Sequence, residues 1–195
     1  MEHQDSDERL LEQAANGETK AFQILYERYR DPIFRFAYRM LGSAEGAEDV
    51  THDCFLSLIK EPGRFDEKRA SLRTYLFAAA RNQSAKRYLN FNREAPLEDY
   101  SETFSTPEAH QPSQRVLDDE LASEVRKAIA SLPPLQREAL VLFEYEDLSL
   151  AEIGAIVGAD SNTVKARLFR ARDKLRASLG RYFRIGRETA TVRRA

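Results

Sequence analysis

Apolar side chains recur every three or four positions along most of this 195-residue chain, which is the spacing of one face of an α-helix. No stretch alternates apolar and polar residues over the length of a β-strand, and no segment repeats at a fixed period. The hydrophobic pattern therefore predicts an all-α protein.

In the N-terminal part, the apolar pattern predicts helices separated by breaks that contain glycine or proline. The first ends at Asn16 and Gly17, and the next apolar stripe continues past Pro32, a residue suited to a first helical turn, and ends at Gly42. A third stripe starts near Ala44, and a fourth helix begins near Ser71. These helices would form one small domain, at residues 10–92.

The stretch from Arg93 to Gln114 carries three prolines, many acidic and hydroxyl side chains, and no helical apolar period. Such a segment cannot bury enough apolar surface to fold alone. We therefore expect two small helical domains, at 10–92 and 118–182, joined by a flexible acidic linker at 93–117. A basic tail follows at 183–195, with Arg187, Arg193 and Arg194; from Arg184 on we expect it to be disordered and able to touch nucleic acid or a regulator.

In the second domain, capping and turn residues predict a helix-turn-helix. Ser149 and Glu152 have the spacing of a capping box, Gly158 permits a tight turn, and Asp160 suits the N-cap of a long last helix. An apolar stripe at Val164, Leu168, Ala171 and Leu175 fixes the inner side of that helix. The outer side is then left for a DNA groove; its candidates are Ser161, Asn162, Thr163, Lys165, Ala166, Arg167 and Arg170.

Charge is distributed in blocks, although the formal net charge is only −2. Residues 64–93 hold 8 Lys/Arg against 2 Asp/Glu, and residues 161–195 hold 11 against 2. Between them, residues 94–120 hold 1 against 8. Two basic blocks predict two patches for a polyanion, because phosphate contacts depend on local cation density. The alternative is that both blocks are solvated helix faces.

The fourth helix carries the residue types of a single-strand binding surface. Tyr88 and Phe91 could stack on unpaired bases, among cations for phosphates and amides for base edges. The polar candidates on its outer side are Arg81, Asn82, Lys86, Arg87 and Asn90. A merely solvated face remains the alternative.

Other function classes have little support in the sequence. A lone cysteine excludes an internal disulfide and, with three histidines, offers poor zinc ligands; Cys54 is most simply a small buried hydrophobe. We expect no cofactor and no metal, and no enzyme, since no phosphate loop or nucleophile with a base appears. The polar N-terminus and the lack of a long apolar run predict a cytoplasmic protein without membrane insertion.

Three stretches, in this order, resemble the extracytoplasmic-function (ECF) sigma factors of bacterial RNA polymerase. They are "GSAEGAEDVTHDCFLSLIK", "RTYLFAAARNQSAKR" and "LPPLQREALVLFEYEDLSLAEIGAIVGADSNTVKARLFRARDKL". The resemblance implies a region 2 bundle, a region 4 helix-turn-helix, and a dissociable specificity subunit without covalent chemistry. It also implies three partners: promoter DNA, an anti-sigma factor and core polymerase. The polymerase would be contacted at its beta-prime clamp helices and beta flap.

The resemblance also assigns roles to residues. Contacts with the polymerase clamp fall on Asp49, His52, Asp53 and Leu56. For recognition and melting of the minus-ten element, the resemblance implies Lys68, Arg69, Arg81, Asn82, Lys86, Arg87 and Asn90. For the minus-thirty-five element, it implies the outer side of the last helix. Two rivals stay open: a sigma mimic that sequesters an anti-sigma factor, and a stand-alone helix-turn-helix regulator with a sensory N-terminal domain.

Overall fold

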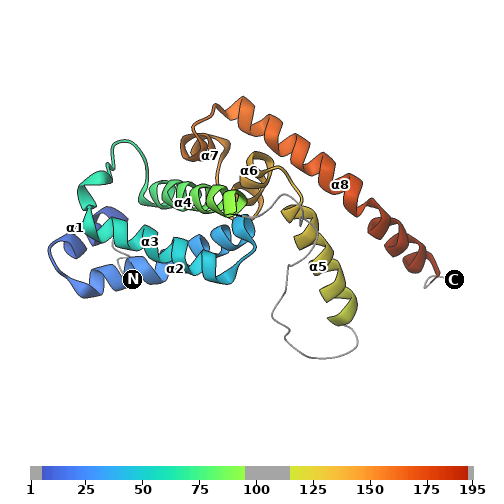
Figure 1. The fold of residues 1–195 in the computed structure, drawn as a ribbon, viewed down its shortest axis with the longest axis horizontal. Coiled ribbons are helices and arrows are strands. Elements are labelled where there is room, and N and C mark those ends of the chain that lie inside the picture. Colours follow the sequence, from blue (N-terminus) through green and yellow to red (C-terminus); the bar gives the residue numbers. More distant parts are fainter. Residues whose placement is uncertain (1–5, 95–114, 193–195) are drawn as a thin grey trace.

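The computed structural model describes residues 6–94 and 115–192, with side chains for 6–88 and 121–180. The described residues form helices and turns, without a β-strand, so the all-α prediction is confirmed (Figure 1). The predicted linker at 93–117 falls largely outside the described residues. In chain order the elements are α1 (Asp7–Ala15), α2 (Thr19–Leu41), α3 (Ala44–Lys60), the short 3₁₀ helix η1 (Pro62–Arg64), α4 (Leu72–Glu94), α5 (Arg115–Ala130), α6 (Pro134–Glu144), α7 (Leu150–Val157) and α8 (Ser161–Val192).

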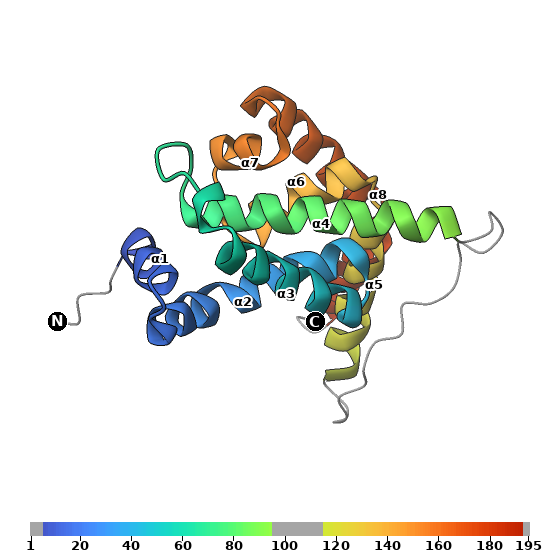
Figure 2. The same ribbon diagram turned by 60° about the vertical axis from the view of Figure 1, so that its left-hand side comes forward.

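The N-terminal domain consists of α1 to α4. Helices α2, α3 and α4 pack on one another, and α1 packs on α2 (Figure 2). The predicted apolar stripes form their core: Leu25 and Ile33 of α2, Val50 and Cys54 of α3, and Leu76 of α4 are all buried. The periodicity of the sequence therefore located the helices and the inner face of α3, whereas on α4 it found the side with Leu76 but not the second buried side with Phe77.

Helix α2 continues through Pro32, which lies inside the helix and not in a first turn. Proline lacks the N–H that would close the preceding helical turn, and in a helix interior it costs about 3 kcal/mol. The buried stripe of Leu25, Tyr29, Ile33 and Phe36 continues on both sides of it. We attribute the uninterrupted helix to that burial, which at roughly 1.5–3 kcal/mol per large apolar side chain outweighs the cost of the proline.

The C-terminal domain consists of α5 to α8 and contains the predicted helix-turn-helix. Ser149 and Glu152 form the capping box at the start of α7, and Gly158 ends that helix at a φ of 65°. Asp160 caps α8 by accepting the backbone N–H of Thr163 at 2.8 Å. These local predictions are confirmed. The features could be predicted because each depends on residues at most three or four positions apart.

Helix α8 runs to Val192, so the prediction that the chain is disordered from Arg184 is wrong as far as Val192. Only one glycine, Gly186, interrupts the stretch RIGRETATV, and Arg, Glu and Ala favour the helix. Arg187 accordingly lies within α8. Arg193 and Arg194 lie outside the described residues.

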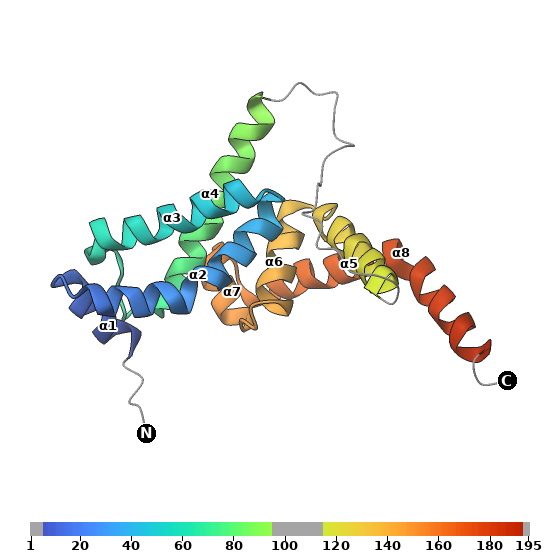
Figure 3. The ribbon, with the colours of Figure 1, turned by 90° about the horizontal axis from the view of Figure 1, so that it is seen from below.

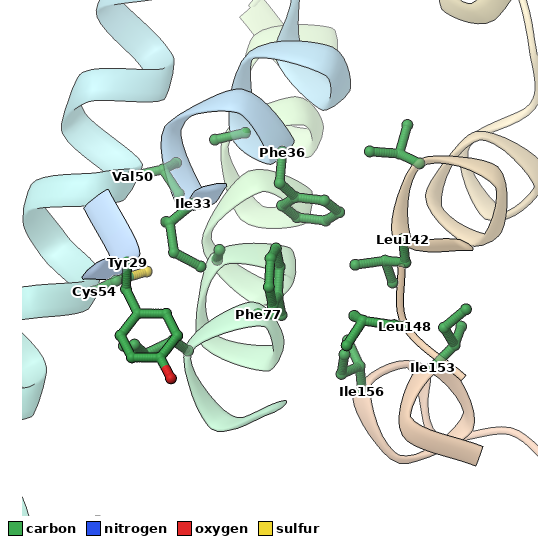
Figure 4. Close-up of a cluster of buried hydrophobic side chains, with 14 of the residues drawn as sticks. Tyr29, Ile33, Phe36, Val50, Cys54, Phe77, Leu142, Leu148, Ile153 and Ile156 are labelled. Atoms are coloured by element: carbon green, nitrogen blue, oxygen red, sulfur yellow. The ribbon is translucent and has the colours of Figure 1, made fainter. Parts of the chain in front are cut away.

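The two domains pack against each other along α4. Helix α7 lies against α4, and α5 and α6 lie against α2, as the view from below also shows (Figure 3). Phe36 and Phe77 meet edge to face at 5.7 Å and point toward Leu142 and Leu148 of the C-terminal domain (Figure 4). Buried residues of the two domains thus belong to one hydrophobic core.

We expect Gly154→Ala to destabilise the helix-turn-helix. A Cβ at Gly154 would stand 2.6 Å from the backbone oxygen of Ala159, which cannot rotate away as a side chain could. The expected loss is about 1–3 kcal/mol of unfolding free energy, measured by urea denaturation.

Gly180→Ala is the matched control for this substitution. Gly180 lies in α8 with open space where its Cβ would stand. The added methyl should raise stability by up to about 1 kcal/mol, because alanine is the better helix former. Equal effects of the two substitutions would contradict the predicted close contact.

Candidate polymerase and nucleic-acid interfaces

The outer face of α3 gathers the predicted polymerase contacts. Asp49 and His52 are exposed, and Asp53 and Leu56 are partly exposed on the same side of the helix. The spacing of three or four residues between them explains why they share a face. The structure therefore brings this candidate set together.

Arg87 of α4 connects two predicted sets that are separate in the sequence. Its guanidinium donates to the Oδ2 atom of Asp49 at 2.9 Å and to the Oδ2 atom of Asp53 at 3.0 Å. All three side chains are at least one-third exposed, so each pair contributes at most about 1 kcal/mol. Such weak pairs can be exchanged for contacts with a partner at little cost.

The loop before α4 presents two predicted minus-ten residues to solvent. Lys68 and Arg69 are exposed, and their backbone N–H groups bond to the Oδ1 atom and the backbone oxygen of Asp66, each at 3.0 Å. Phe65 packs edge to face on Tyr75 at 5.6 Å and anchors the loop to α4. The loop is therefore shaped by Asp66 and Phe65, and its cations remain free to contact a ligand.

The predicted minus-ten residues of α4 have different surroundings. Asn82 and Lys86 are exposed, whereas Arg81 is half-buried and donates from its Nε to both carboxylate oxygens of Glu138, at 3.2 and 3.3 Å. Asn90 lies in α4, but its side chain is outside the described set. Arg81 is thus occupied by the C-terminal domain in this structure.

Helix α8 turns most of its predicted minus-thirty-five residues outward. Ser161, Asn162, Lys165 and Arg170 are exposed, while the stripe of Val164, Leu168 and Ala171 is buried against α6 and α7. Ala166 is partly exposed. The hydroxyl of Thr163 donates to Asp160 at 2.8 Å and so completes the N-cap.

Arg167 differs from the other cations of this helix. It is only partly exposed, and one of its terminal nitrogens is buried without a hydrogen-bond partner. Burial raises the pKa of the Glu138 carboxyl, and the nearby charges of Arg81 and Arg167 oppose that rise. Of the three predicted cations of α8, Lys165 and Arg170 are therefore exposed, whereas Arg167 is partly buried and its charge acts on the Glu138 carboxyl.

Two exposed apolar residues extend the predicted surfaces. Phe169 is 70% exposed between Lys165 and Arg170 on the outer side of α8, and Ile59 is 52% exposed three residues after Leu56 on α3. Both lie outside the buried stripes of their helices. Their outward position follows from the helical periodicity of the sequence, but neither residue was among the predicted contacts.

No group of metal-ligating side chains occurs in the described part of the chain, and no helix there has the length and apolarity needed to cross a membrane. Cys54 is buried within the N-terminal core, and burial raises the pKa of its thiol to about 12. The thiol is therefore protonated and shielded at neutral pH.

Comparison with known proteins identifies the class to which this arrangement belongs. Residues 25–94 match the family model of sigma-70 region 2, and residues 122–175 match that of sigma-70 region 4. The ECF RNA polymerase sigma factor SigW of Bacillus subtilis is 30% identical over 181 residues, which cover 88% of this chain and 95% of that protein. The chain belongs to the ECF sigma factors of the sigma-70 family.

Two further sigma factors are similar to this chain over different shares of their own length. The RNA polymerase sigma-H factor of Pseudomonas aeruginosa is 29% identical over 90% of this chain and 95% of its own length. The ECF sigma factor SigE of Mycolicibacterium smegmatis is 33% identical over 81% of this chain, which spans only 61% of that protein.

Two solved structures share the fold. They are CnrH in complex with the cytosolic domain of CnrY (TM-score 0.68, 27% identity, covering 90% of this chain and 98% of that one) and the sigma factor RpoE with the anti-sigma factor NepR from Bartonella quintana (TM-score 0.65, 26% identity, covering 83% and 98%).

We expect Cys54 to resist alkylation in the native protein. Only the thiolate reacts, and a buried thiol with a pKa of about 12 has almost none at pH 8. Iodoacetamide should modify the chain slowly in buffer and within minutes in 6 M guanidinium chloride, as followed by mass spectrometry. Rapid native labelling at Cys54 would show that the site opens to solvent.

Proposed function

We propose that this chain directs promoter-specific transcription initiation as a dissociable subunit of RNA polymerase. The observation that carries the proposal is the outer face of α8, where Ser161, Asn162, Lys165, Phe169 and Arg170 gather on a helix held by a capped helix-turn-helix. A helix in this setting fits the major groove, with its N-terminal residues near base edges. Lysine and arginine can bond to guanine edges or to phosphates.

Each predicted surface has its own task in this proposal. The outer face of α3 docks on the beta-prime clamp helices, where Leu56 and Ile59 supply apolar contact and Asp49 and Asp53 supply charge. The loop with Lys68 and Arg69, together with Asn82 and Lys86 of α4, captures the melted minus-ten element. The outer face of α8 reads the minus-thirty-five element, while the C-terminal domain binds the beta flap.

Holding two DNA elements at once would explain how small domains reach useful affinity. Each surface carries only a few cations, so each contact is weak and salt-dependent. When polymerase holds both domains, the second contact becomes intramolecular, and the effective concentration of its site rises. Specificity then depends on both elements and on the spacing between them.

Control by an anti-sigma factor and residence in the cytoplasm belong to the same proposal. The fold matches RpoE in its complex with the anti-sigma factor NepR, and CnrH in its complex with the cytosolic domain of CnrY. A partner of this kind would act by hiding the outer face of α3 or of α8.

The first test is run-off transcription with purified core RNA polymerase and a library of genomic promoter fragments. The wild-type chain should bind core polymerase and give promoter-dependent transcripts. Asp49→Lys should weaken binding at least tenfold, because it reverses a charge on the docking face. Glu12→Lys, an equal charge change at an exposed position on α1, is the control and should bind normally.

Failure of the wild-type chain to bind polymerase or to initiate would refute the sigma function. Normal polymerase binding by Asp49→Lys would instead refute only the docking surface.

The second test concerns base recognition by α8. Arg170→Ala should relax the preference at one base pair of the minus-thirty-five element, since loss of a base contact costs about 1–3 kcal/mol. Holoenzyme is used to select binders from a randomised DNA library, and the recovered motifs are compared. Arg176→Ala, an exposed residue farther along α8, is the matched control and should leave the motif unchanged. An unchanged motif for Arg170→Ala would contradict its base-reading role.

A further inference from the structure

Two buried carboxylates of the C-terminal domain face arginines of the N-terminal domain. Glu138 of α6 and Glu146, in the turn before α7, are each 4% exposed. Carboxylates are seldom buried to this extent without a partner of opposite charge. Here each one finds its cations across the boundary between the domains.

Glu138 is paired with an arginine of α4, one of the helices proposed to bind DNA, and is influenced by the charge of an arginine of the other, α8. The Nε of Arg81 in α4 donates to both carboxylate oxygens of Glu138, at 3.2 and 3.3 Å. The charge of Arg167 in α8 also acts on this carboxyl. One acidic side chain is therefore bonded to a cation assigned to the minus-ten element and also feels the charge of a cation assigned to the minus-thirty-five element.

Glu146 lies among cations of the other domain in the same way. Its Oε1 atom is 3.8 Å from a guanidinium nitrogen of Arg39, whose guanidinium also lies 4.0 Å from the centre of the Tyr145 ring. Arg73 of α4 donates to the backbone oxygen of Glu146. In the opposite direction, Arg137 of α6 donates to the backbone oxygen of Met40 at 2.9 Å.

Buried pairs of this kind favour a particular arrangement more than they add stability. The cost of removing both charges from water offsets most of their attraction, whereas an unpaired charge left inside is strongly unfavourable. A domain interface that contains such pairs stays closed only when every buried charge has its oppositely charged partner. When the domains separate, every charge regains water at once, so the charge pairs themselves add only modestly to the cost of opening.

We propose that Glu138 and Glu146, with Arg39, Arg73 and Arg81, form an interdomain latch that holds the free chain closed and keeps Arg81 from nucleic acid. The inference rests on the proposed function in so far as Arg81 is a DNA contact. In the closed state its side chain is only 26% exposed and already bonded to a carboxylate, the group that would compete with a phosphate.

Opening the latch also uncovers apolar surface. Phe36 and Phe77 point toward Leu142 and Leu148 across the same boundary (Figure 4). Exposing them to water is unfavourable, so opening is coupled to a partner that covers these faces. Core polymerase, which would hold both domains, is that partner in this scheme.

The closed state can be measured directly by fluorescence energy transfer. Exposed residues Ala44 in α3 and Ala177 in α8 are replaced by cysteine and labelled with maleimide dyes, while buried Cys54 stays unlabelled. The double variant Glu138→Gln/Glu146→Gln should shift the chain toward lower transfer, with at least a threefold rise in the open fraction. Glu144→Gln/Asp173→Asn makes the same charge change at exposed positions of one domain and should leave the transfer unchanged.

A second measurement asks whether the latch restrains DNA binding. The free chain is titrated with a fluorescent single-stranded oligonucleotide of mixed sequence. The double Glu→Gln variant should bind at least threefold more tightly than the charge-matched control. Arg39→Met, which loosens the latch from the N-terminal side, should also raise the open fraction, and it provides a second variant if the first folds poorly.

Equal energy transfer and equal DNA affinity in the latch variants and the control would overturn the inference. A chain that fails to bind polymerase would overturn the proposed function, but the transfer measurement would still decide whether the latch exists. Lower transfer without tighter DNA binding would overturn the claim that the latch restrains Arg81.

Discussion

Burial of the first half of α4 on two sides is the constraint on which the rest of the structure depends. Leu76 and Phe77 are adjacent in the sequence and therefore point in different directions, yet both are fully buried. The helix packs on α2 and α3 and also receives α7. Shared use of this one helix joins the two domains, and it directs the polar second half of α4, with Asn82 and Lys86, away from the core.

Charged groups then decide what this arrangement can do. Among the exposed cations, Lys68, Arg69, Lys86, Lys165 and Arg170 lie on the predicted DNA surfaces, and they suit a polyanion. The cations at the domain boundary meet Glu138 and Glu146 in surroundings where leaving a charge unpaired would be costly. Basic side chains thus suit ligand binding where they are exposed and hold the two domains together where they are partly buried at the boundary.

Local features were predictable because short-range rules govern them. The capping box at Ser149, the left-handed turn at Gly158, the N-cap at Asp160 and the inner stripe of α8 all follow from residues within one or two helical turns. Pro32 shows the opposite case, because the local preference for a first turn yields to a buried face that continues on both sides. The end of α8 was also missed, since an exposed basic stretch says little about where a helix stops.

By itself, the sequence determined the all-α class, the inner faces of helices such as α3, α7 and α8, and the order of the three motifs that indicate an ECF sigma factor. Only the tertiary structure decided which charges meet. Arg81 and Glu138 are 57 residues apart, and Arg87 lies 34 and 38 residues from Asp53 and Asp49. Helical periodicity gives the direction of a side chain around its own axis, but its partner depends on how separate helices pack. That packing depends on the fit of many apolar side chains at once, which no short stretch of sequence contains.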